Sequence, residues 1–185
     1  VFVFGQGLWS PWYVGSTMTD LDKIYGKDRI IDSPVSEVAV TGAAIGASLY
    51  GYKPIVVHPR MDFMILAVDQ IVTQAAKWSS MFGGQSHPNI TVRGIVNRGG
   101  EQGAQHSQSL HSWFAHIPGL KVVVPSDAYS VKGLLSAAIR DDDPVFVVND
   151  KKVINMTSFV PDENYQIELG KGRYLKRGED ITLVG

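Results

Sequence analysis

The chain has 185 residues, 44% of them hydrophobic and 19% charged, so it can bury one sizeable core and is expected to fold as a single domain. Its 17 basic and 18 acidic residues leave a formal net charge of -1 and are scattered, which excludes the basic surface of a typical nucleic-acid-binding protein. The absence of cysteine excludes a disulfide framework and any site built on thiolates.

The sequence also shows no sign of a membrane anchor. No uninterrupted apolar run reaches the length of a membrane span, and the opening residues, VFVFGQGLW, lack the basic region and cleavage site of a signal peptide. We therefore expect a cytoplasmic protein with neither nucleic acid nor a membrane among its partners.

Strand and helix patterns alternate along most of the chain. Near-continuous runs of Val and Ile predict buried strands, and apolar positions at a spacing of about 3.6 residues predict helices between them. The predicted strands are residues 1–4, 53–58, 90–95, 121–126 and 144–150, and the predicted helices are residues 32–51, 62–81, 108–117 and 128–140. This order predicts an α/β fold: a doubly wound, mainly parallel sheet with helices on both faces, whose ligands bind beyond the carboxyl ends of the strands.

The stretch DSPVSEVAVTGAAIGASLYG, residues 32–51, organises the rest of the chain. It begins with capping residues, places Pro34 where a first helical turn tolerates proline, and has Glu37 as the only carboxylate of an otherwise apolar helix. Gly42 and Gly46 let another backbone lie close, which predicts a buried helix. On position alone, Glu37 is an acid that favours the positive end of the helix dipole, worth about 1 kcal/mol or less.

This stretch, preceded by RII and followed by DFMILAVDQIVTQAAK and QHSQSL, resembles a known family over nearly the whole chain. The resemblance is to the pyrimidine-binding domain of the beta subunit of thiamine-diphosphate-dependent 2-oxoacid dehydrogenases, of the pyruvate dehydrogenase and branched-chain type, which is related to transketolase. It implies a pyrimidine-binding α/β domain over residues 1–150. Residues 151–185 are expected to form one or two short strands in a connector toward a C-terminal domain that these 185 residues do not include.

The resemblance implies roles for three residues. In the family, the acid that matches Glu37 hydrogen-bonds the aminopyrimidine ring of the cofactor. The aromatic residue that matches Phe63 packs against the same ring, and the histidine that matches His106 handles protons or assists acyl transfer. Without the resemblance, Phe63 is a core aromatic and His106 a solvated loop histidine. Gln6 stands where family members usually carry an acid, and Asn97, Arg98 and Glu101 depart from the usual loop pattern, which leaves substrate choice open.

A potassium site is also implied by the resemblance. Family members hold potassium, largely through carbonyl oxygens, and a hard cation on oxygen ligands is chemically reasonable. The matching positions are Ile90, Ala138, Ile139, Asp141 and Asp143. On the residues alone, the acidic run of residues 141–143 is a solvated turn before a strand.

The expected function is the beta-type half of a 2-oxoacid dehydrogenase component that uses thiamine diphosphate. The magnesium and diphosphate site of the family, a GDG-to-NN motif, lies on an alpha-type subunit and is not found in this sequence. We therefore expect a homodimer or heterotetramer whose active site forms between subunits, and an inactive isolated chain. Two alternatives stay open: a transketolase or deoxyxylulose-phosphate-synthase-like fragment, and a non-catalytic domain that only dimerises or binds a partner.

Overall fold

A computed structural model describes residues 1–100 and 102–184, so that Glu101 and Gly185 lie outside the described residues. Its centre is a six-stranded sheet in the order β2-β1-β3-β4-β6-β5, and every neighbouring pair of strands is parallel. The strands are β1 (Phe2–Gln6), β2 (Ile30–Ser33), β3 (Pro54–His58), β4 (Thr91–Val96), β5 (Lys121–Val123) and β6 (Val145–Asp150). The doubly wound parallel sheet predicted from the sequence is confirmed.

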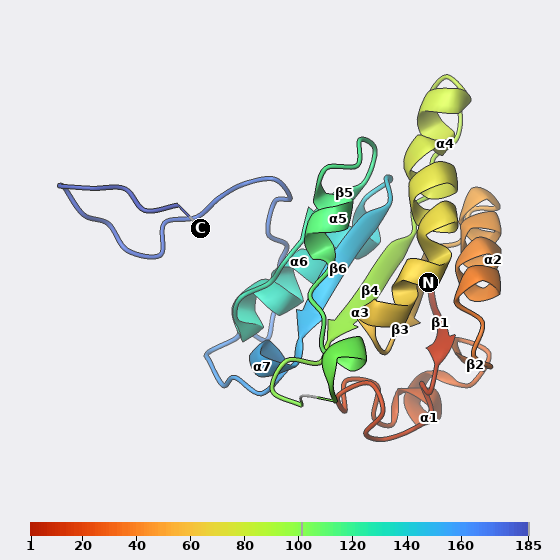
Figure 1. Ribbon diagram of the computed structural model, residues 1–185, viewed down its shortest axis with the longest axis horizontal. Helices are drawn as coiled ribbons and strands as arrows, with labels where there is room; N and C mark the ends of the chain where they lie inside the picture. The colour runs from red at the N-terminus through yellow and green to blue at the C-terminus, as the bar shows by residue number, and fades with distance from the viewer. Residues whose placement is uncertain (101, 185) are drawn as a thin grey trace.

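Helices connect the strands on both faces of the sheet (Figure 1). The α-helices are α1 (Leu21–Tyr25), α2 (Glu37–Leu49), α3 (Met61–Met64), α4 (Ala76–Met81), α5 (His111–Ala115), α6 (Ala128–Arg140) and α7 (Lys151–Ile154). Two 3-10 turns, Ile65–Ala67 and Ala104–His106, and a π-helical segment, Asp69–Ala75, complete the set. Among the described residues, no helix is long and apolar enough to cross a membrane.

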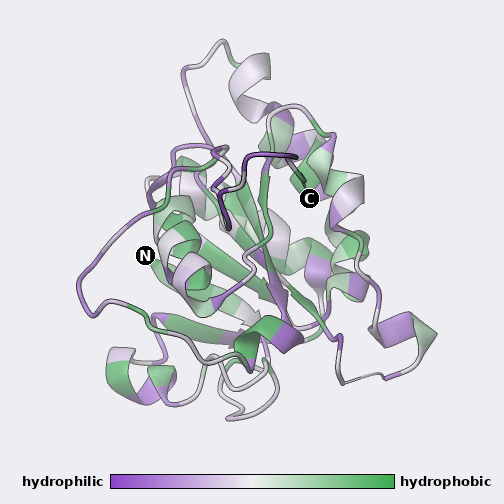
Figure 2. Ribbon diagram, turned by 90° about the vertical axis from the view of Figure 1, so that its left-hand side faces the viewer, coloured by the Kyte–Doolittle hydropathy of each residue, from purple (hydrophilic) through white to green (hydrophobic). Residues whose placement is uncertain are grey.

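Alternate residues of the buried strands supply hydrophobic cores on both faces of the sheet, because successive side chains of a strand point to opposite faces. Val56, Val92 and Phe146 pack under α2, α4 and α5. On the other face, Ile55 and Val57 pack under residues 8–18 and α1, while Val145 and Val147 pack under α6. Figure 2 shows the central strands coloured as hydrophobic (green), in agreement with these cores.

The start of the structure around Glu37 differs from the prediction. Asp32 and Ser33 were predicted to cap the helix, but they belong to β2. This strand was not predicted from the sequence. Pro34 lies in the loop before α2 rather than in its first turn, and Glu37 is the first helical residue. The missed strand is short, lies at the edge of the sheet and consists half of turn-forming residues, which conceals its strand character.

The predicted burial of α2 is wrong for the chain by itself. Val40, Ala44 and Ile45 are buried against the sheet, whereas Val38 is 49% exposed and Gly46 is also exposed. A smooth apolar face of this helix therefore points away from the described core.

Two other helices differ in length or type from the prediction. The segment predicted as one helix over residues 62–81 is helical throughout most of its length, but a 3-10 turn and the π-helical segment interrupt it. The helix predicted over residues 108–117 is reduced to α5, because residues 107–110 lead into it without helical geometry.

The tail forms no strand among residues 151–184, contrary to the prediction, and begins with the short helix α7. Part of it still packs on α6. The backbone N–H of Ile167 donates to the carbonyl of Gly133 at 3.2 Å, and the rings of Tyr129 and Tyr165 stack with their centres 4.6 Å apart. Beyond this contact the chain runs away from the sheet (Figure 1). Whether a domain boundary falls at residue 150 stays a prediction.

Candidate functional site

A cavity of about 390 Å³ lies at the carboxyl ends of β1, β2 and β3. Gly5 and Gln6 of β1 and Val57 and His58 of β3 line it. The chain leaves β1 for β2 on one side and returns to β3 on the other, and such a switch in strand order is where open parallel sheets bind ligands. A Cβ atom on Gly5 would lie 2.3 Å from the carbonyl oxygen of Val57, so only glycine allows this close approach of the two strands.

The three residues assigned to the cofactor by resemblance all line this cavity. Glu37 stands at the first position of α2, Phe63 lies in α3, and His106 ends a 3-10 turn that follows a glycine-rich loop. The rings of Phe63 and His106 meet edge to face with their centres 5.1 Å apart. The carboxylate of Glu37 has no hydrogen bond or ion pair with any other described residue, so it is available to a ligand.

The loop after β1 forms one wall of the cavity. The carboxylate of Asp32 anchors this loop by accepting hydrogen bonds from the backbone N–H groups of Gly7, at 2.6 Å, and Leu8, at 3.2 Å. Gly7 has a φ of 70°, and the ring of Tyr13 occupies the space that a side chain there would need. The side-chain amide of Gln6 donates to the hydroxyl of Tyr13 at 2.8 Å, so Gln6 contributes a neutral polar group to the cavity.

A second wall comes from the loop after β4, which polar contacts hold against α3. The amide oxygen of Gln102 accepts from Arg60 Nε at 3.0 Å, from Arg60 Nη2 at 2.7 Å and from Asn97 Nδ2 at 3.0 Å. Asp62, buried at 2% exposure, accepts from the backbone N–H of Gln108 at 2.9 Å. These contacts fix the segment that carries His106 on both of its sides.

Beneath the cavity, a buried histidine joins the sheet to α2. His58, at the end of β3 and 3% exposed, has Nε2 placed 3.2 Å from the hydroxyl oxygen of Thr41. Burial lowers the pKa of His58 to about 4, because a charged imidazolium loses its hydration there and gains no carboxylate partner among residues 1–100 and 102–184. His58 is therefore neutral at physiological pH.

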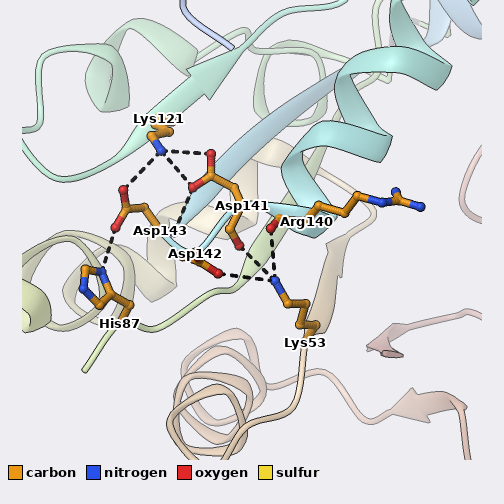
Figure 3. Close-up of polar contacts among 7 residues, drawn as sticks. All are labelled: Lys53, His87, Lys121, Arg140, Asp141, Asp142 and Asp143. Atoms are coloured by element: carbon orange, nitrogen blue, oxygen red, sulfur yellow. Dashed lines mark hydrogen bonds and ion pairs between the residues drawn. The ribbon is translucent and has the colours of Figure 1, made fainter. Parts of the chain in front are cut away.

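The residues assigned to potassium lie at the opposite edge of the sheet, apart from the cavity. Figure 3 shows the carboxylates of Asp141 and Asp143 facing the ammonium group of Lys121, at 2.8 Å and 3.1 Å. Asp143 also meets His87 Nδ1 at 3.0 Å, and this hydrogen bond raises the pKa of His87. The carbonyl of Ile90 accepts a hydrogen bond from the backbone N–H of Val145. Because both carboxylates already face a cation, any potassium here would be held by main-chain carbonyl oxygens.

Sequence reasoning missed Arg60, Gln102, Tyr13 and His58 as cavity residues. His58 and Arg60 could have been found, because His58 ends a predicted strand and Arg60 stands two positions after it, and ligands bind at the carboxyl ends of parallel strands. No comparable signal existed for Gln102, whose contact with Arg60 spans 42 residues of chain.

Comparison with known proteins identifies the domain. The family model described as the transketolase pyrimidine-binding domain matches residues 1–156. The chain belongs to this family. The match covers the whole sheet and every residue of the cavity, so the cavity at the β1–β3 switch is that of a transketolase-type pyrimidine-binding domain.

The pyrimidine-binding domain is similar to several beta subunits of enzymes. It is 46% identical over 159 residues to the beta subunit of acetoin:2,6-dichlorophenolindophenol oxidoreductase of Bacillus subtilis, covering 86% of this chain and 46% of that protein. It is 38% identical to the beta subunit of the pyruvate dehydrogenase E1 component of Cyanidium caldarium, covering 100% of this chain and 56% of that protein. It is 37% identical to the beta subunit of 2-oxoisovalerate dehydrogenase of Bacillus subtilis, covering 100% of this chain and 57% of that protein. The chain thus spans about half the length of the curated relatives it matches.

Among solved structures, the fold is shared with a split gene transketolase described as an inactive beta4 tetramer. The TM-score is 0.71 at 20% sequence identity, and the match covers 96% of this chain and 54% of that one. At this identity the likeness establishes the fold alone.

Proposed function

We propose that this chain is the pyrimidine-binding half of a thiamine-diphosphate-dependent 2-oxoacid dehydrogenase component, acting as a beta-type subunit. The observation that carries the proposal is the carboxylate of Glu37, which faces the cavity without a polar partner among the described residues. The similarity over the full chain to beta subunits of pyruvate and 2-oxoisovalerate dehydrogenases supports it.

The residues around the cavity suit the aminopyrimidine half of the cofactor. When bound, thiamine diphosphate supplies the carbanion stabilisation that lets the bond to the carboxylate of a 2-oxoacid break with release of CO₂. Glu37 would share a proton with a ring nitrogen of the pyrimidine, and partial burial strengthens such a hydrogen bond. Phe63 offers a flat apolar face for the ring, and His106, in contact with Phe63, is the candidate for proton transfer at the substrate.

The proposal requires a second subunit. The cofactor carries its charge on the diphosphate, and the sequence contains no GDG-to-NN motif to hold that group through magnesium. An alpha-type subunit would supply this half of the site in a heterotetramer, and two beta chains would also pair with one another as a homodimer. The exposed small-residue face of α2, which includes Val38, Ala39, Ala43 and Gly46, is the surface we assign to subunit contact, since it begins directly beside Glu37.

A potassium ion at the opposite edge of the sheet is a separate proposal. It would bind the carbonyl oxygens at Ile90, Ala138 and Ile139 and at Asp141 and Asp143 of the acidic turn. Lys121 already neutralises the carboxylates there, and the ammonium group of Lys53 donates to the carbonyl of Asp141, so potassium would have to displace Lys53 from that oxygen. A higher melting temperature in potassium chloride than in choline chloride at equal ionic strength would support this site, and equal melting temperatures would contradict it.

Replacement of Glu37 by Gln tests the function. The amide fills nearly the same volume but cannot share a proton as a carboxylate does, so we expect 2-oxoacid decarboxylation by the complex with an alpha-type subunit to fall by about 10²–10⁴-fold. Thermal unfolding of the variant should stay close to that of the parent chain, because Glu37 has no partner among the described residues to lose and only its interaction with the helix dipole, about 1 kcal/mol or less, is removed.

The matched control is Glu179→Gln, at an exposed position of the tail. It removes the same charge and should leave activity unchanged. Undiminished turnover in the Glu37 variant would remove Glu37 from the mechanism. Turnover of ketose phosphates in place of 2-oxoacids would instead favour a transketolase-type reaction.

A further inference from the structure

Arg60 brings a positive charge to the cavity, and the proposed binding of the cofactor gives this charge no role. It directly precedes α3, two positions after the end of β3, and lines the same cavity as Glu37, Phe63 and His106. A charged side chain that lines such a cavity can hold a neighbouring loop, take part in catalysis or recognise a charge on the substrate.

The guanidinium group is fixed by neutral partners. Two of its N–H groups, on Nε and Nη2, donate to the amide oxygen of Gln102, and one on Nη1 donates to the carbonyl of Pro59 at 2.7 Å. Since an arginine has five such donors, two remain without an acceptor among the described residues. The nearby carboxylate of Asp62 accepts from the backbone of Gln108 instead and forms no ion pair with Arg60. The charge is thus held in place, and no residue that the structure describes forms an ion pair with it.

A second cation reinforces the positive potential at this edge of the sheet. Lys151 follows β6, and its pKa is lowered by burial and further by the positive charge of Arg60. The carboxylate of Asp150 is bound by Arg98 at 2.5 Å and is therefore already paired. Arg60 and Lys151 repel one another, and neither forms an ion pair with a described carboxylate, which favours the binding of an anion.

The chemistry of decarboxylation narrows the kind of anion, and this step rests on the proposed function. The carboxylate next to the carbonyl of a 2-oxoacid loses its charge as CO₂ departs. An arginine bound to that group would stabilise the substrate more than the transition state and would slow the reaction. A fixed cation instead suits a carboxylate that keeps its charge throughout.

We propose that Arg60 binds the second carboxylate of a dicarboxylic 2-oxoacid and so determines substrate specificity. The planar guanidinium can form charge-assisted hydrogen bonds with such a group through its two remaining donors. Monocarboxylic 2-oxoacids and neutral acyloins such as acetoin lack the charge that this site recognises.

The test compares substrates in the complex with the alpha-type subunit. The steady-state rate at which each substrate reduces the dye 2,6-dichlorophenolindophenol is measured for the parent, Arg60→Met and Arg60→Lys. The substrates are 2-oxoglutarate, pyruvate and acetoin. We expect 2-oxoglutarate to have the highest kcat/KM in the parent. Arg60→Met should lower it by about 10–100-fold, the factor of one charge-assisted hydrogen bond, mainly through KM. The loss for pyruvate should be much smaller, and Arg60→Lys should recover part of the preference.

The matched control is Arg140→Met, which removes the same charge at the far edge of the sheet, where the Arg140 side chain points away from the acidic cluster (Figure 3). This variant should keep the parent's higher kcat/KM for 2-oxoglutarate than for pyruvate or acetoin. An equal loss for 2-oxoglutarate and pyruvate in Arg60→Met would show that Arg60 only holds the Gln102 loop, and would overturn the proposal. A parent that prefers pyruvate or acetoin would overturn it as well.

A binding measurement separates this inference from the proposed function. Glutarate carries two carboxylates but no reactive carbonyl, and calorimetry reports its binding to the complex without turnover. Weaker glutarate binding in Arg60→Met than in Arg140→Met would support the anion site even if no 2-oxoacid is decarboxylated, in which case only the proposed function fails. Equal binding in the two variants would refute the role of Arg60.

Discussion

Acidification should destabilise this domain through His58. The imidazole is 3% exposed, and among the described residues its single polar contact is the hydroxyl of Thr41, so the folded state holds it neutral with a pKa of about 4. In the unfolded chain the same group has a pKa of about 6.5. Between these values the unfolded state binds a proton that the folded state does not, so stability falls as the pH falls.

The size of the effect follows from the two pKa values of His58. They differ by about 2.5 units, and each unit corresponds to about 1.4 kcal/mol, so full acidification costs about 3 kcal/mol of unfolding free energy. The loss begins near pH 6.5 and is complete near pH 4. Such a loss is a large fraction of the about 5–15 kcal/mol that typically stabilises a domain.

Urea unfolding of the parent and of His58→Gln at several pH values between 7 and 4.5 measures this contribution. Gln can keep a hydrogen bond to Thr41 but does not titrate. The difference between the two chains in how their unfolding free energy changes with pH therefore isolates the contribution of His58. We expect the parent to lose about 2–3 kcal/mol more than the variant over this range. Parallel pH profiles would refute the reasoning, because they would mean that His58 protonates equally easily in both states.

Two further substitutions test contacts that position the site and its supporting sheet. Asp62→Ala removes the acceptor for the backbone N–H of Gln108, so it should lower the unfolding free energy by about 1.5–3 kcal/mol and lower kcat by displacing the segment that carries His106. Asp62→Asn keeps an acceptor and should lose less stability and less activity. Gly119→Ala should destabilise by at least about 1–2 kcal/mol, because φ at Gly119 is +91° and the new Cβ would lie 1.9 Å from the carbonyl oxygen of Ala76; Gly172→Ala, with open space around it, is the control. Equal melting temperatures for the two glycine variants would contradict the second prediction.

Local composition was sufficient to predict the buried strands, but not the edge of the sheet. Runs such as PIVVH and VFVVND are buried on both faces and read as strands without knowledge of their neighbours. The residues of β2 are half turn-forming, and their strand conformation depends on pairing with β1. The π-helical geometry of Asp69–Ala75 likewise has no signal in an apolar pattern that fits an ordinary helix.

The candidate site was predictable where a residue type is unusual for its surroundings. Glu37 stood out as a lone acid in an apolar helix, and the resemblance directed attention to Phe63 and His106. The polar contacts that hold these residues could not be predicted, because they join segments far apart in the sequence. Arg60 and Gln102 meet only once β3 and β4 are paired, and no local pattern records that pairing.

The order of strands in the sheet has a consequence for how the chain folds during synthesis. β5 precedes β6 in the sequence but pairs with no other strand than β6 in the described sheet, and β6 also joins β5 to β4. Residues 124–144 separate the two strands, so at about 5–20 residues per second the ribosome takes about one to four seconds to deliver the partner that β5 needs. Throughout that interval the backbone of Lys121–Val123 and the edge of β4 are unpaired. The nascent domain is therefore most vulnerable to misassociation just before Asp150 emerges, and any fragment ending before Val145 would retain both open edges.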